Sequence, residues 1–484
     1  MINETYKNAA GKSLRHGGKV KIKEIISRVN LPARASMAYL GASLVGKAVG
    51  FITTPFFTRL ISKEEYGALT LYMTVLGGAS VICSAFSTGS VAYRGFKKYE
   101  GKIGGYLKSS LAVSLCFSLL ICILLFTFMP FIGLDRVFFI PLALQILCDT
   151  AVSVSLAYSR FRYKYGEVMA VGIISSVLPA LVSLLILTKF GCGCGVRIYS
   201  LLAISLISAV AAIIRIFRRP GRADRKMVRY NLSSSLPLLP HSLSVALSGQ
   251  ADKLIITSLM GAEALAKYSV AHSLGIALQF AVTALGSALG PWIIRRLDSG
   301  ESGRIPEIIM PIFSLFCALS LGICALAPEA MGILAPIEYL DAASSIIPIA
   351  LSIPLSLLSY AVTVGLVHAE KGRYTAVISI INLGLCIILN YTLIPRLGYI
   401  GAGLSLLLSQ LGAVLVGFAL LSRVRLSEII PLRTAGRYFL VSCGIGLLAD
   451  YLYGSLSLRV LLLVIPAAFG LRGLFTCARL VKDK

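Results

Sequence analysis

Ionisable residues within long apolar stretches are the positions of this sequence best suited to chemistry. Lys47 lies midway along one apolar stretch, and Asp149 lies in the middle of another. Asp252 and Lys253 are adjacent in a third stretch, and His272 lies in a fourth. A charged group at the centre of a membrane helix costs about 2.5–3.5 kcal/mol, so it normally faces a partner or a hydrated cavity. These residues therefore mark a candidate path for an ion or a polar ligand.

The balance of these charges favours an anionic ligand, because three cations, counting Arg59, oppose two acids. Each position also has a purely structural alternative. Lys253 could extend along its helix to reach the interface, Asp149 could pair with a neighbouring helix, and His272 could satisfy a helix contact. Lys47 is the hardest to explain in this way, because both membrane faces are distant. It is therefore predicted to line a hydrated cavity.

Motifs of soluble enzymes are absent from the sequence. It contains no GxxxxGK[ST] phosphate loop, no HExxH zinc motif and no pair of carboxylates in a polar setting. Most of the 11 cysteines stand alone in apolar stretches, and Cys192 with Cys194 is too little for a metal site. We expect no enzymatic activity, metal or cofactor. Coupling to H+ or Na+ could act through Asp149 or Asp252.

The composition indicates the helices that must position these residues. The chain has 484 residues, of which 57% are hydrophobic and 14% charged, against about a quarter charged in soluble domains. Its apolar stretches have the length of ~20 residues that crosses a bilayer. We predict an all-α polytopic membrane protein with about 14 transmembrane helices. The net charge of +25 lies in short clusters between these stretches, which excludes nucleic acid as a partner.

The positive clusters also predict the orientation of the chain. Most of the 46 Lys and Arg residues fall on alternate loops of one side, which is the cytoplasmic side by the positive-inside rule. The few on the other side include Arg59, Lys63, Arg197 and Arg459, which we assign to outer loops. We predict a multi-pass protein of the bacterial cytoplasmic (inner) membrane, with both termini cytoplasmic, acting as a monomer.

An internal repeat divides the chain. ISKEEYGALTLY (61–72) aligns with MGAEALAKYSVA (260–271), so that Glu64 matches Glu263 and Gly67 matches Ala266. Both segments follow an apolar span, and a basic loop lies between the halves. The prediction is two pseudo-symmetric six-helix lobes plus two C-terminal helices. The predicted parts are a cytoplasmic basic N-tail (1–35), an N-terminal lobe (36–214), a cytoplasmic linker (215–235), a C-terminal lobe (236–421), helices 13 and 14 (438–474) and a cytoplasmic tail (475–484).

Several segments together resemble one family. SGQADKLIITSLMGAEALAKYSVAHSLG (248–275) resembles the seventh-helix region of polysaccharide flippases, and TRLISKEEYGALTLY (58–72) resembles their first helix junction. NLGLCIILNYTLIPRLGYIGAGLSLLLSQ (382–410) is similar to their eleventh and twelfth helices, and LGPWIIRRLDSGE (289–301) to the end of the eighth. These flippases belong to the multidrug/oligosaccharidyl-lipid/polysaccharide exporter superfamily.

The resemblance implies a flippase that carries an undecaprenyl-diphosphate-linked oligosaccharide across the membrane by alternating access, for surface polysaccharide assembly. Implied partners are this lipid-linked oligosaccharide, membrane lipids, and the polysaccharide polymerase and chain-length machinery. Two alternatives stay open. Lipid II flippases are similar and have fourteen helices, whereas in multidrug/cation antiporters the first helix often carries an acid where this chain has a lysine. The candidate substrate-binding residues are Lys47, Arg59, Arg94, Asp252, Lys253, Arg295 and Arg296.

Overall fold

The computed structural model describes residues 31–87, 89–191, 193–462 and 470. The basic N-tail up to residue 30, Cys192, most of predicted helix 14 and the C-terminal tail lie outside the described residues. Every regular element in the described part is helical, which confirms the all-α prediction. Ten helices there are long and apolar enough to cross a membrane. The number fourteen stays a prediction.

The first group of helices forms a bundle that we call the N-lobe. Its members pack mainly in the pairs α3 with α8, α4 with α7, α6 with α7, and α7 and α8 with α9. Their bounds are α3 (Leu31–Leu60), α4 (Lys63–Ser84), α5 (Gly89–Lys98), α6 (Ile103–Ile132), α7 (Phe139–Phe161), α8 (Tyr165–Phe190) and α9 (Gly195–Phe217).

The second group, the C-lobe, is built around α16, which is the most deeply buried of the long helices. Its members are α12 (Ala251–Gly275), α13 (Gln279–Asp298), α14 (Ile305–Ala325), α15 (Ala327–Leu334), the 3-10 segment η5 (Ile337–Ser345), α16 (Ile346–His368), α17 (Gly372–Leu397) and α18 (Tyr399–Arg423). The additional helices α19 (Leu432–Tyr451) and α20 (Leu456–Leu462) pack on α14 at its outer edge.

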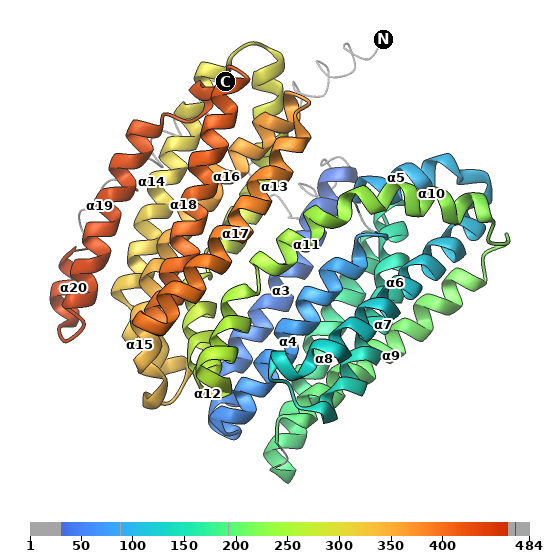
Figure 1. The fold of residues 1–484 in the computed structure, drawn as a ribbon, viewed down its shortest axis with the longest axis horizontal. Coiled ribbons are helices and arrows are strands. Elements are labelled where there is room, and N and C mark those ends of the chain that lie inside the picture. Colours follow the sequence, from blue (N-terminus) through green and yellow to red (C-terminus); the bar gives the residue numbers. More distant parts are fainter. Residues whose placement is uncertain (1–30, 88, 192, 463–469, 471–484) are drawn as a thin grey trace, which may run out of the picture.

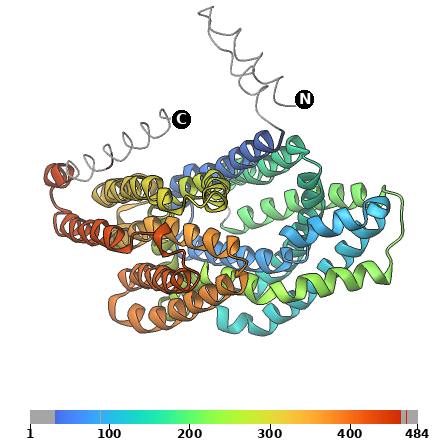
Figure 2. The same ribbon diagram turned by 90° about the horizontal axis from the view of Figure 1, so that it is seen from above.

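The two lobes lie side by side and are not parallel (Figure 1). Their helices converge at the end where α3 finishes and α12 and α15 lie, and they diverge toward the end that carries α5 and α10. The view from above shows the same separation into two groups (Figure 2). At the converging end one apolar core runs through both lobes, with Leu69 and Tyr72 from one side and Leu265 and Ile349 from the other.

Local sequence signals explain the helix ends at this junction. Ser62 accepts a hydrogen bond from the Glu65 amide, and the Glu65 carboxylate accepts one from the Ser62 amide, which is a capping box at the start of α4. The carboxyl ends of α6 and α8 stop at Gly133 and Gly191, both with positive φ. These signals fix where each span turns back.

The helix α12 reverses direction within its length. Gly261 has φ 87° and ψ 178°, outside the helical region. Asp252 and Tyr268 would lie about 24 Å apart on a straight helix at 1.5 Å per residue. Their side chains are nevertheless hydrogen bonded at 2.7 Å. The halves on either side of Gly261 are therefore antiparallel.

The predicted linker 215–235 is mostly ordered against the N-lobe. It contains the end of α9 and the helix α10 (Arg225–Ser235), which packs on α5 and α6. Lys98 of α5 lies 4.2 Å from the ring centroid of Tyr230 in α10. The chain then continues through η3 (Leu236–Leu238) and α11 (Leu239–Ser248), which crosses to the C-lobe (Figure 1).

Candidate functional site: the interface between the lobes

The two repeated segments cross each other at the converging end, where α4 packs along α12. At the crossing, a Cβ atom added to Gly67 would lie 1.9 Å from the backbone oxygen of Ala262. Ala266, which the repeat aligns with Gly67, is fully buried. Small residues at both aligned positions therefore allow the backbones to approach closely.

Charged residues around this crossing form a network that we call the lobe clasp, made of Lys63, Glu263, Lys267, Glu338 and Asp341. The Lys63 Nζ lies 3.1 Å from Glu263 and 2.6 Å from Glu338, so it joins the N-lobe to two segments of the C-lobe. The Lys267 Nζ lies 2.9 Å from Asp341. Because these side chains are partly exposed and screened by water, each pair contributes little to stability. The clasp can therefore open at low cost.

The end of α3 adds a second connection between the lobes. The Thr58 hydroxyl donates to the Leu334 carbonyl at 2.9 Å, and the Arg59 guanidinium donates to the carbonyls of Gly332 and Ile333. These carbonyls end α15, where a cation is favoured by the helix dipole. The structure thus places the predicted ligand Arg59 at the closed end of the interface, bound to the opposite lobe.

Lys47 lies further along the same helix, about 18 Å from Arg59 at 1.5 Å per residue. Its Nζ lies 4.2 Å from the ring centroid of Phe280, near the start of α13 in the C-lobe. The residue is exposed, and the cation–π contact holds it at the face between the lobes. Of the predicted site residues, Lys47 is the one placed midway along this face.

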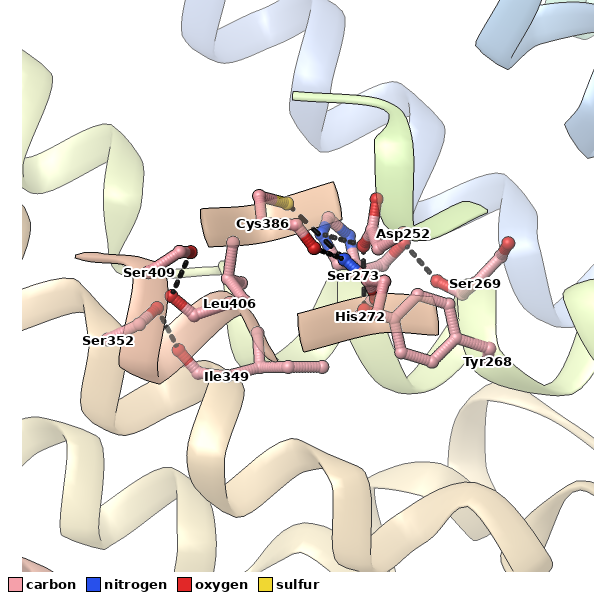
Figure 3. A network of polar contacts seen from close by, with 11 residues as sticks. Asp252, Tyr268, Ser269, His272, Ser273, Ile349, Ser352, Cys386, Leu406 and Ser409 are labelled. Carbon is pink, nitrogen blue, oxygen red and sulfur yellow. Dashed lines mark hydrogen bonds and ion pairs between the residues drawn. The ribbon is translucent and has the colours of Figure 1, made fainter. Parts of the chain in front are cut away.

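Asp252 belongs to a buried polar network inside the C-lobe (Figure 3). It is 3% exposed, accepts a hydrogen bond from the Tyr268 hydroxyl at 2.7 Å, and lies 3.6 Å from the His272 Nε2. Beside it on α17, Asn390 donates to the Cys386 carbonyl, while its own side-chain oxygen has no described partner. A carboxylate held by a phenol and an imidazole can take up and release a cation. Lys253 is half-buried next to it.

Asp149 lies in the N-lobe, where the Ser205 hydroxyl of α9 donates to its carboxylate at 3.0 Å. One turn earlier on α7, Gln145 accepts a hydrogen bond from the Tyr72 hydroxyl at 2.7 Å. The structure therefore puts the two predicted ion-coupling acids in separate lobes, each in its own polar environment.

The remaining predicted ligands lie toward the diverging ends of the lobes. Arg94 is exposed on α5, and Arg295 is exposed in the last turn of α13. Arg296 forms an ion pair with Glu301 and lies 5.8 Å from the ring centroid of Trp292. The seven predicted ligands are therefore spread along the lobe interface and the C-lobe interior and do not converge on one point.

Two arginines that the sequence assigns to outer loops are buried within helices. The prediction of a loop was wrong for both, while their place on the outer side stays a prediction. Arg197 is 9% exposed in α9, donates to Ser183 at 3.4 Å and lies 5.4 Å from the ring centroid of Phe57. Arg459 is 2% exposed in α20 and pairs with Glu329 of α15 at 2.6 Å. A lone arginine between apolar spans resembles a loop residue, and only packing shows which side of the helix it faces.

Comparisons with known proteins agree with this architecture. A probable low-salt glycan biosynthesis flippase of Haloferax volcanii is 22% identical over 383 residues, covering 78% of this chain and 80% of the relative. A lipid II flippase in an inward closed conformation aligns with TM-score 0.66 and 14% identity, covering 92% of this chain and 99% of that chain. An inward-facing multidrug resistance transporter aligns with TM-score 0.59 and 15% identity, covering 81% and 98%.

These structural likenesses show that the chain shares its fold with a lipid II flippase and with a multidrug resistance transporter. The sequence match is more specific, because residues 33–297 match a family described as polysaccharide biosynthesis protein. This match extends over more than half of the chain and runs from α3 to α13, leaving out only the first two residues of α3 and the last residue of α13. The chain therefore belongs to the polysaccharide biosynthesis protein family.

Proposed function

We propose that this protein is a flippase that moves an undecaprenyl-diphosphate-linked oligosaccharide across the bacterial cytoplasmic membrane by alternating access. The observation that carries the proposal is Lys47, a cation midway along the face between two lobes that are joined at one end and diverge at the other. Family membership and the glycan flippase relative support the substrate class.

The arrangement suits a substrate with a charged head and a long apolar tail. The exposed Arg94 and Arg295 would meet the diphosphate at the diverging end, and Lys47 would hold it midway. Arginine binds phosphate oxygens in a bidentate way, which favours it at the entrance. The lobe clasp, Thr58 and Arg59 close the opposite end, which the charge distribution predicts to face outward.

Gene deletion tests the proposal most directly. Lipid-linked repeat units should accumulate on the cytoplasmic leaflet, where an impermeant oxidant cannot reach them in intact cells, and surface polysaccharide should be lost. Normal surface polysaccharide in a strain without a redundant flippase would contradict the proposal. Lysis on depletion would indicate lipid II as the substrate, and raised drug sensitivity alone would indicate an antiporter.

The first prediction concerns Lys47. Lys47→Ala should reduce transport at least tenfold at unchanged expression, since it removes the mid-interface cation. Lys47→Arg should keep a substantial part of the activity, because it retains the charge and the contact with Phe280. The activity of both variants is measured by how far each restores surface polysaccharide in the deletion strain. Full activity of Lys47→Ala would remove this residue from the substrate path.

The second prediction concerns coupling at Asp252. Asp252→Asn should keep the fold, because the amide oxygen can still accept from Tyr268, but it should lose gradient-driven transport. Asp149→Asn is the matched change in the other lobe. The two variants are compared by their rates of transport into proteoliposomes under an imposed H+ or Na+ gradient. Equal gradient dependence in the wild type and Asp252→Asn would assign coupling elsewhere.

A further inference from the structure

A basic cavity at the end of the N-lobe lies away from the lobe interface and has no part in the transport proposal. It has a volume of about 370 Å³ and lies between the ends of α7 and α9, the start of α8 and the turn after α9. Its charged lining consists of Lys164, Glu167, Arg215, Arg218 and Arg219. Four cations against one carboxylate leave the cavity strongly positive.

The single carboxylate neutralises only part of this charge. Glu167 lies 3.0 Å from the Lys164 Nζ and 3.8 Å from Arg215, and it also accepts from the Ser159 hydroxyl. Arg219 is half-buried and lies over the Tyr158 ring, 4.5 Å from its centroid. Among the described residues no carboxylate pairs with Arg218 or Arg219. Two guanidinium groups in the cavity therefore lack a counter-charge.

The wall that carries these arginines is held firmly in place. A Cβ atom on Gly104 would lie 2.1 Å from the Pro220 oxygen, and one on Gly105 would lie 2.3 Å from the Arg222 oxygen. The Lys108 Nζ donates to the carbonyls of Arg219 and Gly221 at 3.1 and 2.9 Å. The turn after α9 is thus seated on α6, and the arginines are positioned before any ligand arrives.

An exposed apolar ridge on α9 leads away from this cavity. Ile207, Val210, Ile214 and Phe217 are 65%, 50%, 45% and 59% exposed and follow helical spacing. The ridge ends one residue before Arg218. A ligand with a phosphate in the cavity could therefore extend acyl chains along α9 into the bilayer.

We propose that this cavity binds the phosphate of an anionic phospholipid whose acyl chains lie along α9. Basic pockets between membrane helices on the cytoplasmic side are suited to such head groups. A planar guanidinium pair can bind the phosphate oxygens in a bidentate way. The site lies within the N-lobe, so it would hold a lipid that moves with this lobe.

Lipid titration of the full-length protein tests the proposal without any transport assay. Phosphatidylglycerol is added to protein in phosphatidylcholine micelles, and binding is followed by native mass spectrometry and by the rise in Tm. Arg218→Gln with Arg219→Gln should weaken phosphatidylglycerol binding about 10- to 30-fold, since each basic residue near an anionic surface contributes about 1 kcal/mol. Phosphatidylcholine binding should not change.

The matched control removes two charges from the same end of the lobe, outside the cavity. Arg225→Gln with Arg229→Gln, both exposed on α10, should change binding by less than twofold. Arg219→Gln could impair folding because it removes the contact of Arg219 with the Tyr158 ring. In that case Arg218→Gln alone should still weaken phosphatidylglycerol binding about fivefold.

Three results would overturn the proposal. Equal losses in the cavity pair and the control pair would indicate a diffuse charge effect. No loss in the cavity pair would exclude the site. Competition by soluble glycerol phosphate at the same concentration as phosphatidylglycerol would show a site for free phosphate in place of a lipid. Since no outcome involves transport, failure here would leave the flippase proposal unaffected.

Discussion

Gly67→Ala should abolish or strongly reduce transport, whereas Gly78→Ala on the same helix should leave it nearly unchanged. At position 67 the new Cβ would meet the Ala262 carbonyl at 1.9 Å, and neither backbone can yield locally. At position 78 the nearest atom, the Cγ of Gln250, lies at 3.8 Å, which is ordinary contact. The two substitutions are chemically identical and differ only in what the methyl group meets.

The physical reason is that α4 and α12 must separate by roughly 1 Å or more to restore normal contact distances. Overpacking of this kind costs about 1–3 kcal/mol, which shifts a two-state equilibrium by about 5- to 150-fold. Each lobe also has a core of its own away from the crossing. The expected defect is therefore in closing the converging end of the interface.

Two measurements separate a closure defect from misfolding. Surface polysaccharide in the deletion strain reports transport. Maleimide labelling of Ala264→Cys, a position 6% exposed in the interface, reports closure. In a background without native cysteines, Gly67→Ala should raise the labelling rate and Gly78→Ala should not. If Gly67→Ala showed normal transport and an unchanged labelling rate, close approach of α4 and α12 would not be required for closure or transport.

The second large effect is expected from the ion pair between the buried Arg459 and the partly exposed Glu329. Glu329→Ala should destabilise the protein by about 3 kcal/mol, because it leaves Arg459, which is 2% exposed, without its carboxylate. Arg459→Met should cost less, about 1 kcal/mol, since the remaining Glu329 side chain is 39% exposed and water can hydrate it. The order of the two effects follows from which partner is buried.

The Tm of each purified variant in detergent shows which substitution destabilises the protein more. The double variant Glu329→Gln with Arg459→Met should recover most of the loss, because it leaves no buried charge. A larger effect of Arg459→Met than of Glu329→Ala would contradict the argument.

The same pair predicts a pH dependence. The hydrogen bond from Arg459 lowers the pKa of Glu329 below its ordinary value. The stabilising effect of the ionised Glu329 is therefore complete above about pH 4.3, the pKa of a glutamate in the unfolded chain. It is lost as the pH falls through the lower pKa that Glu329 has in the folded protein.

The all-helical class of the fold could be predicted from the sequence, because it depends on the length and composition of the apolar stretches. The same stretches identify Lys47, and the repeat pairs Gly67 with Ala266, two small residues on the helices α4 and α12 that cross. Contacts between distant segments could not be predicted. Arg59 binds carbonyls more than 270 positions away, and which side of a helix meets which neighbour is decided by packing of the whole bundle.

The hairpin within α12 shows the same limit. Composition predicts two spans, but the approach of Tyr268 to Asp252 requires the positive φ of Gly261 and the packing of α17 beside it. A sequence pattern identifies Asp252 as unusual, and only the folded chain supplies its partners.

The lobe clasp also links the conformation of this protein to the ionic strength of the medium around it. Its charges remain partly in contact with water, and salt shortens the range of such interactions from about 8 Å at 0.15 M to about 3 Å at 1 M. In the orientation that the charge distribution predicts, a saltier exterior would loosen the clasp and favour opening on that side, while dilution would tighten it. The ionic strength outside the cell would then set how often the lobes separate there.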